Sequence, residues 1–267
     1  VHARWVDSIL NSMTLDEKIG QLFMIACWSR NPDSEKVRIG KIIEENHIGG
    51  LIFMQGGPLR QAALTNYFQA LSKIPLLISQ DSEWGLSMRL DSTMNFSKQL
   101  MLGAIRDTAV IHDFGAEMAR ELKRLGVHIS FSPVVDINNN PLNPVIGDRS
   151  FGENKYDVTN YGLAYMHGLQ SNGIIACAKH FPGHGNTDED SHKVLPVINA
   201  SRSELDSTEL YPFRKLMDAG VGSIMVAHLN IPALDTTQKL PSSLSPQIVT
   251  GLLRNELGFH GLVITDA

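Results

Sequence analysis

The chain has 267 residues, of which 43% are hydrophobic, and a formal net charge of −5. This hydrophobic content is enough for the core of one large domain or two small ones. Acidic and basic residues are mixed without a basic tract, which argues against nucleic acid or an anionic membrane surface as the main partner. No apolar run approaches the ~20 residues that a transmembrane helix needs.

The first third of the chain alternates between strand-like and helix-like segments. Thr14-Leu15-Asp16-Glu17 has the capping-box pattern and predicts a short helix. Short apolar runs then predict strands, and apolar residues at helical spacing predict the helices between them. The predicted strands are 22–26, 50–54 and 75–79, and the predicted helices are 34–46 and 58–72.

The same alternation continues to the last residue, without a linker or a change of composition. The predicted strands are 128–131, 174–178, 223–227 and 262–265, and the predicted helices are 108–125, 157–170, 203–218 and 246–257. Continuous apolar strands with crossover helices indicate an α/β protein with a parallel sheet that is covered on both faces.

Seven strands in one run favour a (β/α)8 barrel of the TIM type over an open doubly wound sheet. No G-x-G-x-x-G fingerprint follows a strand, as a dinucleotide-binding open sheet would require. A closed barrel of this type has eight strands. We therefore expect residues 1–267 to form a single (β/α) barrel domain with about seven βα units, truncated at its C-terminal end.

The two cysteines, Cys27 and Cys177, both fall inside apolar runs that predict strands. Cysteine in such runs is usually a small buried hydrophobic residue. We expect two buried thiols rather than a disulfide or a nucleophile.

Polar side chains follow five of the predicted strands. In a barrel, the carboxyl ends of the strands converge on one face, so these side chains are expected to share one pocket. Several carboxylates with cationic and imidazole groups suit a polar neutral ligand such as a sugar, whose hydroxyls need many hydrogen bonds. The residues are Asp81, Asp136, Lys179, His180, His228 and Asp266. Arg149, which lies between two glycines, follows an Asn/Pro-rich loop after the fourth strand.

Five of these residues also have a structural interpretation. Asp136 is as well explained as a turn residue before an Asn-rich loop as by ligand contact. His228 is equally explained as a hydrogen-bonded core histidine. Arg149 could form a surface ion pair, and Lys179 and His180 could be solvated residues at a strand end.

A polar loop rich in glycine follows the fifth predicted strand. Residues 179–192 contain three histidines, three acids and one lysine. His180, His184 and His192 could hold a metal, but the intervening proline and glycines argue against the helix that usually presents such ligands. We keep metal binding as a minor alternative and expect no metal and no cofactor.

Five strings of residues carry a family resemblance. They are Lys179-His180-Phe181-Pro182-Gly183-His184-Gly185 with Asp190-Ser191-His192, Arg149-Ser150-Phe151-Gly152, Ala227-His228, Leu244-Ser245, and Gly261-Leu262-Val263 with Thr265-Asp266-Ala267. With these strings the chain resembles bacterial β-N-acetylglucosaminidases of glycoside hydrolase family three. The likeness runs from about Thr14 to the last residue, and the Asp-Ser-His element separates the hexosaminidase branch from the β-glucosidases.

The resemblance implies a role for each matching position. Asp266 matches the catalytic nucleophile, and His192 matches the general acid/base, which Asp190 orients. The residues that match contacts to the terminal N-acetylglucosamine are Asp81, Arg89, Arg149, Lys179 and His180. One departure stands out: the family usually has Asp-Gln-Glu-Gly-Gly after the third strand, whereas this chain has Asp81-Ser82-Glu83-Trp84-Gly85. The sugar contact near Trp84 and the leaving-group preference therefore stay open.

The implied activity is retaining exo-hydrolysis of terminal non-reducing β-linked N-acetylglucosamine through a covalent glycosyl-Asp266 intermediate. A carboxylate at the end of a rigid strand can be aimed at the anomeric carbon. A histidine suits both protonation of the leaving group and activation of water, because its pKa lies near neutrality. A rival mechanism uses the acetamide of the substrate as nucleophile.

The substrate is expected to be a small carbohydrate, from peptidoglycan fragments or from chitin-type oligomers. A β-glucosidase-type exo-hydrolase of the same family and a catalytically silent sugar-binding domain are the alternatives. The N-terminal region resembles secreted members, so we expect the periplasm or cell envelope rather than the cytoplasm. An additional C-terminal domain is a further expectation for the full-length protein.

Overall fold

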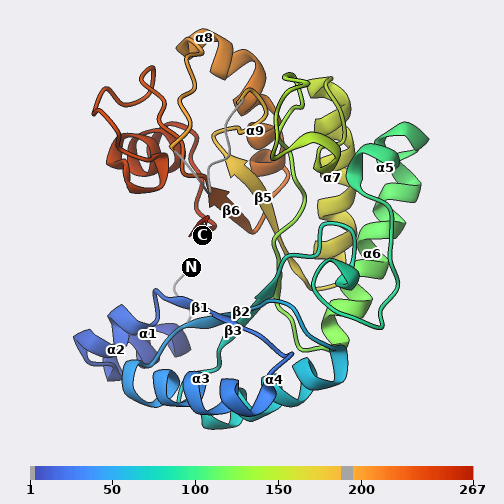
Figure 1. Cartoon of the computed structure of the whole chain (residues 1–267). Helices are drawn as coiled ribbons and strands as arrows, with labels where there is room; N and C mark the ends of the chain where they lie inside the picture. The colour runs from blue at the N-terminus through green and yellow to red at the C-terminus, as the bar shows by residue number, and fades with distance from the viewer. Residues whose placement is uncertain (1–3, 188–194, 267) are drawn as a thin grey trace.

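The computed structural model describes residues 4–187 and 195–266, and within them seven strands form one parallel sheet (Figure 1). Each strand pairs with its successor in the chain, in the order β1-β2-β3-β4-β5-β6-β7. The strands are β1 Met24–Cys27, β2 Gly50–Phe53, β3 Leu77–Gln80, β4 Ile129–Ser130, β5 Ile175–Phe181, β6 Ser223–Val226 and β7 Leu262–Thr265.

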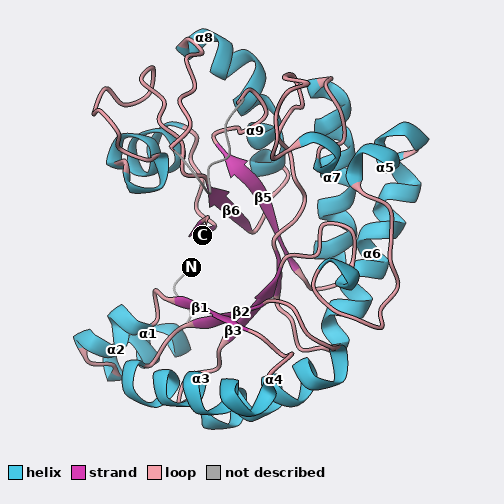
Figure 2. Ribbon diagram, viewed as in Figure 1, coloured by secondary structure: helices cyan, strands magenta, loops and turns pink. Residues whose placement is uncertain are grey.

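Helices connect the strands and lie on the outside of the curled sheet (Figure 2). The α-helices are α1 Arg4–Ser12, α2 Leu15–Gly20, α3 Pro32–Asn46, α4 Pro58–Leu71, α5 Gln99–Ile105, α6 Thr108–Arg124, α7 Lys155–Ser171, α8 Arg202–Glu204 and α9 Leu210–Asp218. Short 3-10 helices are η1 Leu86–Met88, η2 Gly147–Arg149 and η4 Ser242–Leu244, and π-helices are η3 Leu205–Glu209 and η5 Gln247–Glu256.

The curled sheet is an incomplete TIM-type barrel, as predicted. Within the described residues, β1 pairs only with β2 and β7 pairs only with β6. Figure 1 shows the two outer strands on either side of an opening, with helices around the remaining circumference. A closed barrel of this type has eight strands, so the described sheet covers most of the barrel wall.

The short helix α2 forms as the capping-box pattern predicts. The Thr14 hydroxyl accepts a hydrogen bond from the Glu17 amide, and the Glu17 carboxylate accepts one from the Thr14 amide. Helices α1 and α5 were not predicted. The predicted helix at 203–218 is divided into α8, η3 and α9, and the predicted helix at 246–257 is a π-helix with wider turns.

The strand β5 is longer than predicted, and β4 is shorter. β5 extends through Phe181, so Lys179 and His180 lie in the strand and not after it. A parallel bridge between Val134 and Lys179 continues the pairing beyond β4, and the register shifts between Ala178 and Phe181. Irregular pairing of this kind turns side chains away from strict alternation, and Lys179, His180 and Phe181 are all buried.

One continuous hydrophobic core lies between the sheet and its helices, and a smaller cluster inside the barrel includes Ile129, Phe131 and Cys177. Cys27 and Cys177 are both buried and free, as predicted. Within the described residues, no helix has the length and apolar character that would let it span a membrane.

Candidate active site

A cavity of about 280 Å³ lies at the carboxyl ends of the strands. All of the predicted sugar-binding residues line it, together with the predicted nucleophile. The lining residues are Asp81, Glu83, Trp84, Met88, Arg89, Val145, Arg149, Lys179, His180, His184 and Asp266. The predicted acid/base pair, His192 and Asp190, lies outside the described residues.

Two carboxylates and three cations alternate at the base of this cavity. Lys179 Nζ lies 2.9 Å from Asp81 Oδ1 and 2.8 Å from Glu83 Oε1. Arg149 donates to both Glu83 oxygens, at 2.7 and 3.0 Å, and Arg89 donates to Asp81 at 2.5 Å. We call these five residues the charged cluster.

Glu83 is the member of the charged cluster that sequence analysis did not assign to the site. Its side chain is fully buried, and it bridges Arg149 and Lys179, which are 66 and 96 positions further along the chain. The sequence signal that could have assigned Glu83 to the site was its position two residues after Asp81, in the string where the chain departs from the family pattern. The interpretation of Arg149 as a surface ion pair is wrong, since its partner carboxylate is buried.

The charged cluster keeps Asp81, Glu83 and Lys179 ionised. Burial raises the pKa of Glu83, but the charges of Lys179 and Arg149 outweigh it and hold that pKa well below the ordinary value of 4.5. Burial likewise raises the pKa of Asp81, and Lys179 and Arg89 bring it below its usual range. Burial lowers the pKa of Lys179, and the two carboxylates raise it above its usual value. The cavity therefore presents fixed charged donors and acceptors, which make strong hydrogen bonds to hydroxyl groups.

Asp136 holds the turn that follows β5. Its buried carboxylate lies 2.7 Å from His180 Nδ1 and accepts the backbone amides of His180 and, at 2.7 Å, of His184. Asp136 is therefore not a cap of the Asn-rich loop, and it does not line the cavity. The two partners of His180 assign its tautomer. Nδ1–H donates to Asp136, and Nε2, which lies 3.3 Å from Arg149, accepts from the guanidinium.

Asp266 follows β7 directly, and its backbone is held on both sides. Its amide donates to the Val226 carbonyl at 2.9 Å. His228 Nε2 lies 2.9 Å from the Asp266 carbonyl, and His228 Nδ1 lies 2.6 Å from the Ser243 hydroxyl. The imidazole thus donates to the carbonyl and accepts from the hydroxyl. His228 is a hydrogen-bonded structural histidine that fixes the backbone of the predicted nucleophile.

His184 lines the cavity beside His180, although sequence analysis considered it only as a metal ligand. Burial lowers its pKa, and its Nδ1 lies 2.9 Å from the Thr187 hydroxyl. Among the described residues, His184 Nε2 is buried without a hydrogen-bond partner. In the same part of the chain, no three His, Cys, Asp or Glu side chains are grouped as metal ligands would be. Because His192 lies outside that part, the expected absence of a metal stays a prediction.

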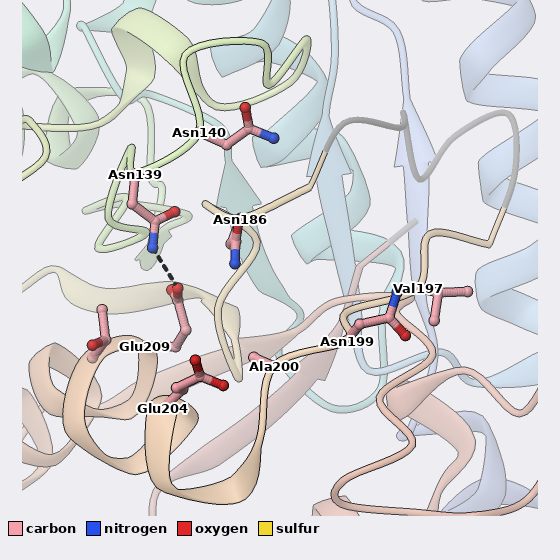
Figure 3. Close-up of a pocket in the computed structure, with 9 residues that line it drawn as sticks. Asn139, Asn140, Asn186, Val197, Asn199, Ala200, Glu204 and Glu209 are labelled. Atoms are coloured by element: carbon pink, nitrogen blue, oxygen red, sulfur yellow. Dashed lines mark hydrogen bonds between the residues drawn. The ribbon is translucent and has the colours of Figure 1, made fainter.

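A second cavity, of about 510 Å³, adjoins the turn that follows β5 and is lined mainly by amide and carboxyl side chains (Figure 3). Glu209 projects towards Asn139, which donates to its Oε1 at 2.8 Å. The other oxygen of Glu209 is buried and has no hydrogen-bond partner among the described residues. Burial raises the pKa of Glu209 to about 7, and the nearby charge of Asp136 adds to the effect.

Glu209 is therefore expected to make the protein less stable as the pH rises. The unfolded carboxyl loses its proton near pH 4.5 and the folded one near 7, so stability falls between these values and stays low above them. The difference corresponds to roughly 3 kcal/mol. Glu209→Gln keeps the acceptor for Asn139 and should remove this loss, which urea unfolding at pH 5 and pH 8 would measure. Glu204→Gln, an exposed carboxyl of the same cavity, is the matched control, and an unchanged pH slope in Glu209→Gln would contradict the prediction.

Comparison with known proteins identifies the family of the chain. Residues 14–267 match the glycosyl hydrolase family 3 N-terminal domain. The chain belongs to this family. The family match covers the whole of the curled sheet, from before β1 to the end of β7.

Two relatives of the family 3 chain carry different activity names. It is 35% identical to β-hexosaminidase A of Pseudoalteromonas piscicida, over 86% of this chain and 42% of the relative. It is 32% identical to a β-N-acetylglucosaminidase/β-glucosidase of Cellulomonas fimi, over 98% of this chain and 47% of the relative. The chain thus spans less than half the length of these relatives.

Among solved structures, the family 3 chain is similar to a β-N-acetylglucosaminidase of the same family from Paenibacillus sp. str. FPU-7. The TM-score is 0.88 and the sequence identity 38%, over 96% of this chain and 49% of the other. The fold similarity thus extends over nearly the whole chain.

Proposed function

We propose that this family 3 chain is the catalytic barrel of a retaining exo-β-N-acetylglucosaminidase. The observation that carries the proposal is the cavity in which Asp266 faces the same space as the charged cluster. Five charged groups beside one carboxylate at a strand end suit a ligand with many hydroxyls and one reactive carbon. The β-hexosaminidase names of the relatives support N-acetylglucosamine as that ligand.

In the proposed reaction, Asp266 is the nucleophile. Its carboxylate oxygen bonds to the anomeric carbon as the bond from that carbon to the leaving oxygen breaks. His192, oriented by Asp190, gives its proton to the leaving oxygen. The same histidine then takes a proton from water, whose oxygen bonds to the anomeric carbon and releases Asp266. One water is consumed, and the anomeric configuration is retained.

The charged cluster has the complementary role of holding the terminal sugar. Asp81 accepts hydrogen bonds from hydroxyl groups, and Arg89, Arg149 and Lys179 donate to hydroxyl oxygens. The fully buried Glu83 holds Arg149 and Lys179 in place. Because their mutual ion pairs already fix these groups, little reorganisation is needed when the sugar binds. We propose fragments of peptidoglycan as the substrate, with chitin-type oligomers as the alternative, and the periplasm or cell envelope as the location.

A β-glucosidase is the second candidate function, because the relative from Cellulomonas fimi carries both activity names. Release of p-nitrophenol from the β-N-acetylglucosaminide and from the β-glucoside separates the two. We expect the N-acetylglucosaminide to be preferred and its hydrolysis to be lost in His192→Ala. Preference for the glucoside would favour the second candidate. Sugar binding without turnover on either glycoside would instead identify a silent binding domain.

A further inference from the structure

The lining of the active-site cavity is divided between charged and apolar side chains. The charged cluster forms one part of it, and Trp84, Met88 and Val145 are the apolar side chains among the lining residues. Trp84 is the largest of the three and is only partly buried. It stands in the string where the chain departs from the usual family pattern, so its role does not follow from the resemblance.

The backbone on both sides of Trp84 is fixed. The Tyr165 hydroxyl lies 3.1 Å from the Ser82 carbonyl and 3.3 Å from the Glu83 carbonyl. Gly85 follows with a φ of +98°, and a Cβ there would lie 2.8 Å from the Phe96 ring. With clamped carbonyls before it and, after it, a glycine that another residue could not replace without strain, the backbone that carries Trp84 is fixed.

A neighbouring side chain, that of Lys98, also holds the indole ring of Trp84. Lys98 Nζ lies 5.1 Å from the centroid of the Trp84 ring, within cation–π range. Asp148 in turn holds this ammonium at 2.7 Å. The ring is therefore a preorganised apolar surface beside a charged one.

We propose that Trp84 packs against a carbon–hydrogen face of the pyranose ring bound in this cavity, and so acts as a binding and specificity residue for that sugar. This inference rests on the proposed function. A pyranose carries its hydroxyls around the edge and C–H groups on its faces. The charged cluster can form hydrogen bonds with the hydroxyls at the edge of the pyranose, and an aromatic ring can pack against one of its C–H faces. Rejection of ligands without such a face, such as linear polyols, follows from the same geometry.

The test compares Trp84→Ala with Trp84→Phe, which keeps an aromatic ring. Calorimetry gives the Kd of free N-acetylglucosamine, and kinetics give KM and kcat for two N-acetylglucosaminides with different leaving groups, p-nitrophenol and a second N-acetylglucosamine. We expect Trp84→Ala to weaken sugar binding about tenfold and to raise both KM values equally, while kcat changes little. Trp84→Phe should recover most of the loss. Trp28→Ala, whose ring lies 5.6 Å from Arg38 and outside the cavity, should behave as wild type.

Two results would overturn the inference: an unchanged Kd for free N-acetylglucosamine in Trp84→Ala, or a KM that changes for only one leaving group. The second result would place the ring against the leaving group. A wild-type protein that binds glucose and not N-acetylglucosamine would instead refute the proposed function, and the same variants would then be titrated with glucose. Binding of neither sugar would refute both proposals.

Discussion

Asp266→Asn is expected to abolish turnover, with a loss on the order of 10⁴-fold or more in kcat. The amide has nearly the shape of the carboxylate, so it fits the space at the end of β7. Its backbone contacts with Val226 and His228 do not involve the side chain and should persist. The amide oxygen, however, is a weak nucleophile and cannot form the glycosyl ester.

Binding should survive this substitution, because the charged cluster is intact. The Kd of N-acetylglucosamine, measured by calorimetry, should stay within a few-fold of the wild-type value. A variant that binds sugar normally and turns over at the wild-type rate would show that Asp266 is not the nucleophile. A 2-fluoro glycoside that traps the covalent intermediate gives a second readout. Label on Asp266 supports double displacement, whereas turnover without label supports nucleophilic attack by the substrate acetamide.

Glu83→Gln is expected to lower the free energy of unfolding by about 3–5 kcal/mol at pH 7, because it leaves buried cations with too few carboxylates. Among the described residues, Arg149 loses its ion-pair partner, and Lys179 keeps Asp81 as its one remaining partner. Urea unfolding of both proteins measures the difference. Asp148→Asn is the matched control: it removes a carboxylate from the exposed ion pair with Lys98 and should cost less than about 1 kcal/mol.

The effect of Glu83→Gln should also depend on pH. The pKa of Glu83 lies below its ordinary value in the folded protein, so the carboxylate contributes stability above about pH 4.5. This contribution is lost as the pH falls through the folded-state pKa. The difference between wild type and variant should therefore be constant from pH 6 to 8 and shrink in acid. A difference of under 1 kcal/mol at pH 7 would mean that the cluster tolerates the loss of a carboxylate.

Local patterns in the sequence predicted the elements of the barrel. The strand β7 was placed at its observed bounds, and the capping box of α2 was recognised from four residues, because both depend on neighbours a few positions apart. The convergence of Asp81, Lys179, His180 and Asp266 also followed from the sequence, since parallel strands bring their carboxyl ends to one edge.

The partners of the buried polar groups were decided by the tertiary structure alone. Glu83 meets Lys179, and Asp136 meets His180, only because β3, β4 and β5 are neighbours in a curled sheet whose irregular pairing turns Lys179 and His180 inward. Glu209 lies against the turn at Gly183 because the helix after β5 folds back onto the barrel. No local signal distinguishes such a carboxyl from an exposed one. The sequence alone determined which residues occupy the strand ends. The packing of distant segments decided which of them form ion pairs, because the energy of a buried charge depends on the groups that surround it in space.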